Sequence, residues 1–399
     1  MKRFVLCTIL LCCLLSQSLD EILHKVYQNN NAIGMSVIVT AKNKMVFSGV
    51  YGLRDVDRKL SITQDTIYRI ASISKMITAT ALMQLFERGK FQLDDDISDY
   101  LKYKVVHPHF PKEKITFRSL LAHTSGLRDD KAYYTFLRED DIIPLRELLC
   151  EEGKYFSRNL FDEKHPPGYF KYANVNYGVI ASLVEVLSEE RFDKYCERYI
   201  FAPLNITASF NIHTLKNVDN IAALYRYKDE QWQAQADHFQ GKPPAKKDFS
   251  GYTPGTNGFL FAPQGGLRIS AKNLAKLMMF YYDKQNNNVL QSPTKELMYK
   301  IVWQYDKKNG DNYYGIFNSY ALGNHTTTDL IRGEKLIGHP GEAYGLISDM
   351  YFSPTKEFGI VFISNGAKNW QKGKHSGWYR IEEEVFQHCY AFVQKYLAE

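Results

Sequence analysis

The stretch Ala71-Ser72-Ile73-Ser74-Lys75 opens a segment with helical periodicity, and the interpretation of the whole chain depends on it. The apolar residues of this segment recur at helical spacing: Ile73, Met76, Ile77, Ala79, Leu82, Met83, Leu85 and Phe86. Gly89 follows them, so the pattern predicts a helix of several turns that ends before this glycine. Residues three apart share one face of a helix, and we therefore expect Ser72 and Lys75 to lie side by side at its start.

A lysine beside a serine is one way to build a nucleophile. The amine can take the hydroxyl proton, and the amides of the first helical turn can stabilise negative charge. The pattern is weak when it stands alone, because Ser-x-x-Lys occurs by chance in many chains. Ser72 would then be a helix N-cap and Lys75 a solvated side chain.

The chain begins Met1-Lys2-Arg3 and continues with an apolar run from Phe4 to Leu15. A basic start followed by a short apolar run is typical of a secretory signal peptide, and this run is too short to span a bilayer comfortably. We expect a signal peptide over residues 1–18, with cleavage near Ser16 to Ser18; the alternative is an uncleaved anchor. The sequence thus predicts an exported protein, periplasmic or secreted.

The composition is that of a globular protein, with 45% hydrophobic, 14% aromatic and 24% charged residues among 399. Its net charge of +6 is spread along the chain without a basic stripe, which argues against a nucleic-acid partner.

Cysteines and histidines do not indicate a metal site. Three of the six cysteines lie in the leader, and the remaining Cys150, Cys196 and Cys389 allow at most one disulfide. The sequence has neither Cys-x-x-Cys nor His-Glu-x-x-His, and it shows no nucleotide-binding fingerprint. We therefore predict no metal and no cofactor.

Strand-like patterns lie near both ends of the chain, and helical patterns lie between them. The strands are predicted at Ile33–Thr40, Met45–Tyr51, Tyr313–Leu322, Gly345–Phe352 and Phe358–Ser364. Helices are expected at Leu19–Tyr27, across much of Ile143–Ile200, at Ala271–Tyr282 with Ser270 as N-cap, and at Ile381–Leu397; Phe201 to about Phe259 reads as irregular.

This order predicts an α+β protein with an antiparallel sheet built from both chain ends and flanked by helices. Residues 19–399 would form one domain, with a mainly helical middle lobe inserted at about 90–260. The groove between sheet and lobe is the expected place for a site.

Two further motifs combine chemically useful side chains with turns. Tyr172-Ala173-Asn174 follows Pro166-Pro167-Gly168 and precedes a helix predicted from Tyr177 to Leu187. Gly338-His339-Pro340-Gly341 lies on a strand edge, where glycine lets a substrate backbone approach closely. Each also has an ordinary structural interpretation, since the chain has 28 tyrosines and a lone histidine is more often structural.

Ser72-x-x-Lys75, Tyr172-x-Asn174 and His339-x-Gly341 stand in the order and approximate spacing of the β-lactamase-related serine hydrolases. The chain resembles this family, which includes class C β-lactamases, D-alanyl-D-alanine carboxypeptidases and β-lactamase-like esterases, over roughly residues 31–393. Supporting stretches are Ile115–Leu127, Pro167–Gly178, Pro203-Leu204-Asn205 and Gly265-Gly266-Leu267. Three motifs in order are far more specific than any one of them.

The resemblance implies catalytic roles for three residues. Ser72 would be the acylated nucleophile, Lys75 would share or take its proton, and Tyr172 would activate the deacylating water. An unperturbed lysine or tyrosine, with a pKa near 10, is the wrong base at neutral pH unless its pKa is shifted by about 2–3 units. The two cannot both be bases at once, and which of them is the main base stays open here.

The resemblance also implies a binding set. Asn174 would orient Lys75 and hold a substrate amide, while His339 and Gly341 would form the far wall of the groove. The oxyanion hole would combine the backbone N–H groups of Ser72 and Glu342. Many β-lactamases carry Lys-Thr-Gly where this chain has His339-Pro340-Gly341, and histidine provides little fixed positive charge at neutral pH.

The sequence therefore predicts an exported serine hydrolase that acts on an amide or ester. Its substrate would be a D-amino-acid peptide, including a cell-wall peptide, a β-lactam or a small ester, and no stable protein partner is predicted. The alternatives are a penicillin-binding-type protein that acylates but hardly turns over, and a non-catalytic scaffold of the same fold.

Overall fold

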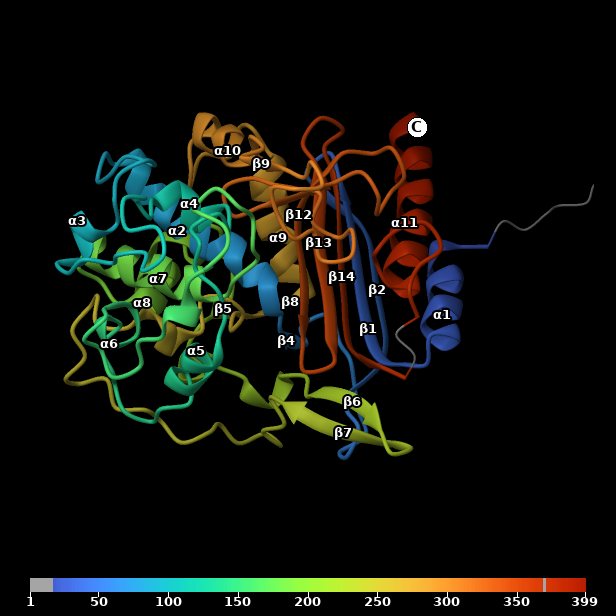
Figure 1. The fold of residues 1–399 in the computed structure, drawn as a ribbon. Coiled ribbons are helices and arrows are strands. Elements are labelled where there is room, and N and C mark those ends of the chain that lie inside the picture. Colours follow the sequence, from blue (N-terminus) through green and yellow to red (C-terminus); the bar gives the residue numbers. More distant parts are fainter. Residues whose placement is uncertain (1–16, 369–370) are drawn as a thin grey trace, which may run out of the picture.

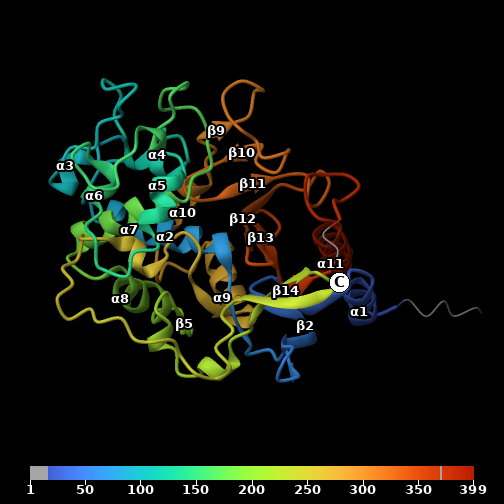
Figure 2. The same cartoon turned by 60° about the horizontal axis from the view of Figure 1, so that its bottom comes forward.

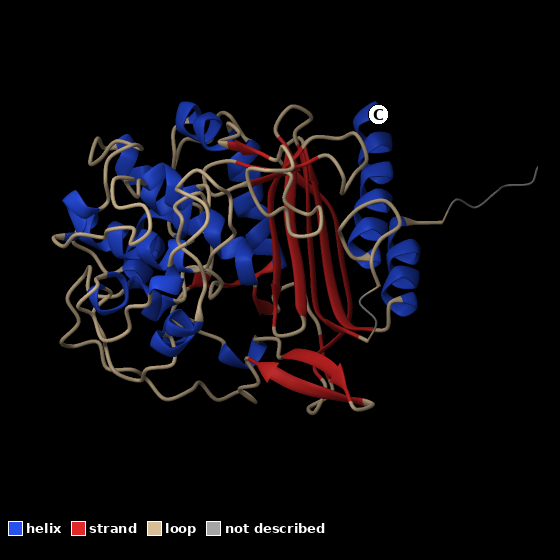
Figure 3. Ribbon diagram, viewed as in Figure 1, coloured by secondary structure: helices blue, strands red, loops and turns tan. Residues whose placement is uncertain are grey.

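A nine-stranded antiparallel sheet forms the centre of the computed structural model, which describes residues 17–368 and 371–399. The strand order is β3-β2-β1-β14-β13-β12-β11-β10-β9 (Figures 1 and 3). Most of the predicted signal peptide, residues 1–16, lies outside the described residues.

The two ends of the chain meet in the middle of this sheet. Strand β1 (Ala32–Ala41) forms a hairpin with β2 (Lys44–Asp55) and pairs on its other side with β14 (Phe358–Ala367), in a register that places Val37 opposite Phe362. Strands β13 (Leu346–Ser353) and β12 (Leu336–Ala343) follow. The short strands β3 (Leu60–Ser61), β11 (His325–Thr327), β10 (Ser319–Tyr320) and β9 (Trp303–Gln304) complete the edges. The predicted α+β sheet built from both chain ends is confirmed.

Helices cover both faces of the sheet. On one face lie α1 (Leu19–Asn29) and α11 (Arg380–Ala398), and on the other lies α9 (Ala271–Tyr282) (Figure 1). Ser270 caps α9 as predicted, because its side chain accepts a hydrogen bond from the Asn273 amide at 3.2 Å. Ser18 caps α1 in a reciprocal pair with Glu21.

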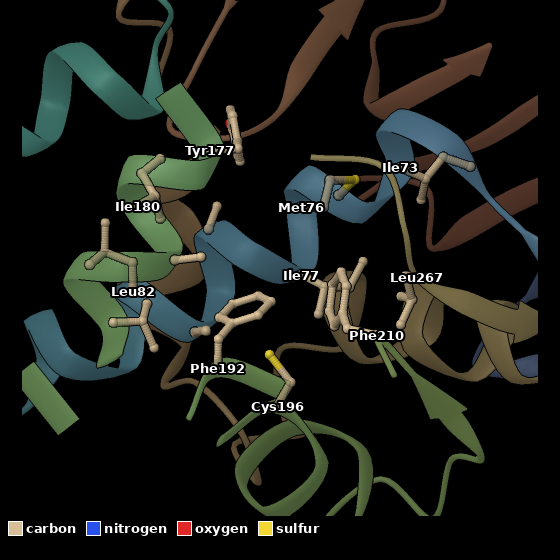
Figure 4. Close-up of a cluster of buried hydrophobic side chains, with 14 of the residues drawn as sticks. Ile73, Met76, Ile77, Leu82, Tyr177, Ile180, Phe192, Cys196, Phe210 and Leu267 are labelled. Carbon is tan, nitrogen blue, oxygen red and sulfur yellow. The ribbon is translucent and has the colours of Figure 1, made fainter. Parts of the chain in front are cut away.

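The second half of the molecule is a helical lobe beside the sheet, as Figure 2 shows from below. Its centre is a pair of buried helices, α2 (Ser74–Glu87) and α7 (Val175–Ser188). Ile77 and Leu82 of α2 lie near Ile180 of α7 in one apolar core (Figure 4). Other, shorter helices are α3 (Ser98–Leu101), α4 (Phe117–Leu121), α5 (Lys131–Phe136), α6 (Arg146–Leu149), α8 (Phe192–Cys196) and α10 (Ser292–Tyr299). Helix α10 lies against α9, where the Tyr299 hydroxyl donates to the Tyr281 carbonyl.

Two expectations for the later half of the chain are corrected. The predicted strand Tyr313–Leu322 is a strand only at Ser319–Tyr320, because Tyr313 and Tyr314 adopt left-handed φ angles of 48° and 59° and turn the chain. The stretch read as irregular contains a hairpin of β6 (Leu224–Lys228) and β7 (Gln231–Ala236). Its turn residues Asp229 and Glu230 have positive φ without the usual glycine or asparagine, which removes the normal sequence signal.

A third small sheet links the two halves. Strand β8 (Arg268–Ser270) lies between β4 (Ile67–Arg69) and β5 (Ala208–Ser209). Strand β4 leads directly into the Ser72 turn. The helical pattern expected across Ile143–Ile200 is interrupted between Cys150 and Asn174 by loops and the short 3-10 turn Arg158–Leu160.

The three cysteines outside the leader are buried free thiols, so no disulfide joins Cys150, Cys196 or Cys389. Within residues 17–368 and 371–399, no helix is both long enough and apolar enough to cross a membrane.

Phe386 provides a test of how α11 holds the sheet. It is fully buried and its ring lies 6.0 Å from that of Tyr351 on β13. We expect Phe386→Ala to lower the free energy of unfolding by about 3–5 kcal/mol, since it leaves a cavity in a packed interface. Its exposed neighbour Gln387 provides the control, because Gln387→Ala should change this free energy by about 0.5 kcal/mol or less. Urea unfolding measures both, and equal losses would contradict the packing described here.

Candidate active site

Ser72 lies on a tight turn between strand and helix. The turn Ala71–Ile73 is a 3-10 helix that continues into α2, and Ala71 has a φ of 47°, in the left-handed region. Ser348 on β13 donates a hydrogen bond to the Ile70 carbonyl at 3.0 Å. A Cβ atom on Gly341 of β12 would come within 2.5 Å of that same carbonyl oxygen, so only glycine lets the strand approach this closely. The sheet therefore holds the serine turn directly.

Lys75 lies beside Ser72, one turn into the helix, and it is fully buried. Its Nζ donates hydrogen bonds to Ser72 Oγ at 3.0 Å, to Asn174 Oδ1 at 2.8 Å and to the Gln264 carbonyl at 2.7 Å. All three N–H bonds of an ammonium are thus directed to oxygens. The structure brings together the serine, the lysine and the asparagine that the sequence singled out.

Burial changes the acid–base chemistry of this lysine. Desolvation lowers the pKa of Lys75 from 10.5 to about 7, and the nearby charge of Asp129 opposes part of that shift. Near neutral pH a large fraction of Lys75 is therefore a neutral amine, which can accept a proton from Ser72.

Asp129 is a site residue that the sequence did not reveal. Its carboxylate accepts hydrogen bonds from the Asn174 backbone at 3.0 Å, the Asn174 side-chain Nδ2 at 2.8 Å and the Val175 amide at 2.9 Å. Asp129 therefore caps the start of α7 and fixes the Asn174 amide, so that its oxygen faces Lys75. Burial raises the pKa of Asp129.

Tyr172 completes the arrangement. Tyr172 borders the cleft beside Ser72, and hydrogen bonding to Ser72 is one of the influences on the pKa of its hydroxyl. Its ring is stacked on Phe317, with centroids 5.0 Å apart and planes 12° apart, and lies 4.3 Å from the ring of His123. The Lys75 Nζ lies 4.9 Å from the Tyr172 ring centroid, so the lysine faces the ring. The structure thus joins the third predicted residue to the other two.

The pKa of Tyr172 moves in the opposite direction from that of Lys75. Burial raises the pKa of Tyr172 well above 10, although its hydrogen bond to Ser72 lowers it in part. A cation such as Lys75 would favour the phenolate, but desolvation dominates here. Tyr172 is therefore a neutral phenol at physiological pH.

The β12 residues take two different positions. Strand β11 pairs with β12 only along Leu336–Gly338, so the edge of residues 339–343 is left to face the serine turn. Gly341 and Glu342 line the crevice there, where their backbone was expected. His339 is buried with its Nε2 2.9 Å from the Tyr320 hydroxyl, and it does not line the crevice. The His339 side chain therefore packs behind the cleft against Tyr320, whereas the resemblance implied that it would form part of the cleft wall.

The crevice extends to two sides of Ser72. One part has a volume of about 540 Å³ and reaches Trp378 and Glu382 at the start of α11. The other has a volume of about 850 Å³ and reaches Tyr133 and Phe259 in the helical lobe. Ser72, Tyr172 and Asn174 border both parts, which makes them the centre of an extended cleft.

Comparison with known proteins identifies the family of this chain. The family model "Beta-lactamase" matches residues 19–383. The chain belongs to the beta-lactamase family. Protein flp of Staphylococcus aureus (strain MRSA252) is 26% identical over 355 residues, which are 88% of this chain and 62% of flp. This beta-lactamase family member therefore spans less than two thirds of the length of that curated relative.

Solved structures share the beta-lactamase family fold. D-amino acid amidase from Ochrobactrum anthropi SV3 superposes with a TM-score of 0.70 at 18% identity, covering 95% of this chain and 98% of the amidase. An octameric penicillin-binding protein homologue from Pyrococcus abyssi gives a TM-score of 0.68 at 22% identity, covering 95% of this chain and 76% of that chain.

Lys75 should make stability depend on pH. Its pKa is lower in the folded protein than in the unfolded chain, so between pH 7 and 10.5 the unfolded chain binds more protons and stability rises with pH. We expect the unfolding free energy of wild type, minus that of Lys75→Met, to rise by about 2 kcal/mol from pH 7 to pH 9. Urea unfolding at both values measures it. If the unfolding free energies of wild type and Lys75→Met change with pH in parallel, folding does not lower the pKa of Lys75.

Proposed function

We propose that this protein is a serine hydrolase that cleaves an amide or ester through an acyl-enzyme on Ser72. One observation carries the proposal: a fully buried Lys75 with a pKa near 7 lies 3.0 Å from Ser72 Oγ. An amine poised near neutrality beside a hydroxyl is what activates a serine without a histidine.

The first half of the reaction forms the acyl-enzyme. Ser72 Oγ attacks the substrate carbonyl carbon while its proton passes to Lys75 Nζ. The backbone N–H of Ser72, with that of Glu342 on the free strand edge, stabilises the oxyanion. When the tetrahedral intermediate collapses, the Tyr172 phenol protonates the leaving amine or alcohol, and the Lys75 ammonium returns a proton to Tyr172.

The second half releases the acyl group. A water molecule attacks the ester carbon while its proton passes to the neutral Lys75, either directly or through the Tyr172 hydroxyl. Collapse of this intermediate returns the proton to Ser72 Oγ and frees the carboxylic acid. Asn174 keeps the lysine amine directed at the serine throughout, because its own amide is held by Asp129.

For the substrate, we propose an amide or peptide of a D-amino acid, with small esters as the second class. The D-amino acid amidase of the same fold supports this choice. A β-lactam is disfavoured, because burial and the Lys75 charge hold the pKa of His339 well below 6.5, so this histidine offers no cation where many β-lactamases carry lysine. We also propose export, on the basis of the basic and apolar residues 1–15.

Covalent labelling tests the nucleophile. A fluorescent, uncharged fluorophosphonate should label wild type and fail to label Ser72→Ala. Ser74 provides a matched control, because its hydroxyl accepts a hydrogen bond from the Leu267 amide and Ser74→Ala should therefore still be labelled. Equal labelling of wild type and Ser72→Ala would show that another residue reacts. With a fluorescent penicillin, a label that persists for hours would favour an acylating protein without turnover.

The pH dependence tests which group is the base. We expect kcat/KM for a neutral ester to fall about tenfold per pH unit below pH 7 and to level off above it, because only the neutral amine of Lys75 is active. Tyr172→Phe should lower kcat by about 10²–10⁴-fold and keep this acid limb. Loss of the limb in Tyr172→Phe would instead assign it to the phenol.

A further inference from the structure

Arg69 is a cation in the cleft that the reaction above does not use. It ends strand β4, three residues before Ser72, and its side chain lines the 850 Å³ part of the cleft together with Ser72 and Asn174. It is partly buried, so its charge is shielded from water on most sides.

The guanidinium of Arg69 forms no salt bridge with the described residues, although the charge of Asp237 acts on it from a greater distance. Within the described parts of the chain, no carboxylate oxygen lies within 4.0 Å of its guanidinium. Arg268 lies directly opposite on β8, and Asp237 holds that arginine with bonds of 2.7 and 3.0 Å. Asp237 is therefore already engaged, and burial together with the charge of Arg268 lowers the pKa of Arg69.

Two contacts fix the orientation of Arg69 and leave part of it available. Its Nε donates to the Gly265 carbonyl at 3.1 Å, and the Tyr344 ring lies 5.0 Å from its central carbon. Neither contact uses the terminal Nη groups, which form no hydrogen bond with the described residues. A planar guanidinium held by one edge and one face presents its remaining nitrogens as a fork that matches a carboxylate.

The same turn positions Arg69 and the catalytic lysine. The Gln264 carbonyl accepts from Lys75 Nζ, and the next carbonyl, that of Gly265, accepts from Arg69 Nε. An anion bound to Arg69 would therefore lie at a fixed place relative to Ser72. Arg226, an exposed residue of β6, lines the same part of the cleft, whose wall also includes the carboxylates of Glu139, Asp141 and Glu342.

We propose that Arg69 binds a carboxylate group of the substrate and so selects anionic amides or esters over neutral ones. This inference rests on the proposed hydrolase function and adds its substrate class. Arg69 would supply, from the helical-lobe side of the cleft, the fixed positive charge that His339 does not supply from β12.

Matched esters test the proposal in the wild-type protein. One pair carries the charge on the acyl group, as the mono-p-nitrophenyl ester of glutarate against that of glutaramic acid. The other carries it on the leaving group, as 3-carboxyphenyl acetate against 3-carbamoylphenyl acetate. We expect kcat/KM to be about 10- to 100-fold higher for the carboxylate of at least one pair, the range of a charge-assisted hydrogen-bonded pair, and the responding pair shows which side Arg69 serves. The preference should weaken as salt is raised.

Variants locate the source of this preference. Arg69→Gln should reduce the kcat/KM ratio between the two esters to about one, and Arg69→Lys should keep only part of it, since lysine lacks the fork. Arg146→Gln removes the same charge from an exposed helix outside the cleft and should keep the full ratio. Thermal unfolding checks that each variant is folded. If Arg69→Gln is not folded, the proposal is judged by the kcat/KM ratio of wild type and by whether Arg69→Lys lowers that ratio.

The outcomes separate this proposal from the function on which it rests. If Ser72 is labelled by the neutral fluorophosphonate but wild type shows no preference within either pair, Arg69 does not select carboxylates. The same conclusion follows if Arg69→Gln keeps the wild-type ratio. If Ser72 is not labelled and neither ester is cleaved, it is the hydrolase function itself that fails.

Discussion

The burial of Lys75 is the constraint on which the rest of this structure depends. An amine without access to water must find its hydrogen-bond partners in the protein, and here it finds them in Ser72, Asn174 and the Gln264 carbonyl. These partners come from three distant parts of the chain. Burial destabilises the Lys75 ammonium and so lowers its pKa to about 7. This lowers the stability of the folded protein, and it leaves a neutral amine available near neutral pH.

The two halves of the fold have different tasks around this lysine. The sheet holds the serine turn, through the Ser348 hydroxyl and the space left at Gly341. The helical lobe supplies Asn174 and, behind it, Asp129, which caps α7 and directs the asparagine oxygen at the amine. Neither half contains all of these residues, because the serine turn is held by the sheet while Asn174 and Asp129 belong to the helical lobe.

Burial also gives Lys75 and Tyr172 different protonation behaviour. Both groups titrate near 10 in water, and burial moves their pKa values apart, because it disfavours the cation of Lys75 and the anion of Tyr172. The lysine is thereby partly a neutral amine near pH 7, and the tyrosine stays a neutral phenol. Arg69, whose guanidinium forms no ion pair with the described residues, is a further cationic group at this boundary. It differs from Lys75 because a guanidinium keeps its charge at physiological pH.

The sequence alone determined the features that depend on local spacing and order: the α2 pattern after Ser72, the Ser270 cap, strands from both chain ends, and three motifs in family order. It did not reveal the β6–β7 hairpin, because Asp229 and Glu230 take left-handed conformations without glycine. It also could not reveal Asp129, which meets the start of α7 some 45 residues further on. Only the tertiary structure decided in which direction each pKa moves and whether Arg69 forms an ion pair with the described residues, because pKa values and charge pairing depend on burial and on neighbours distant in sequence.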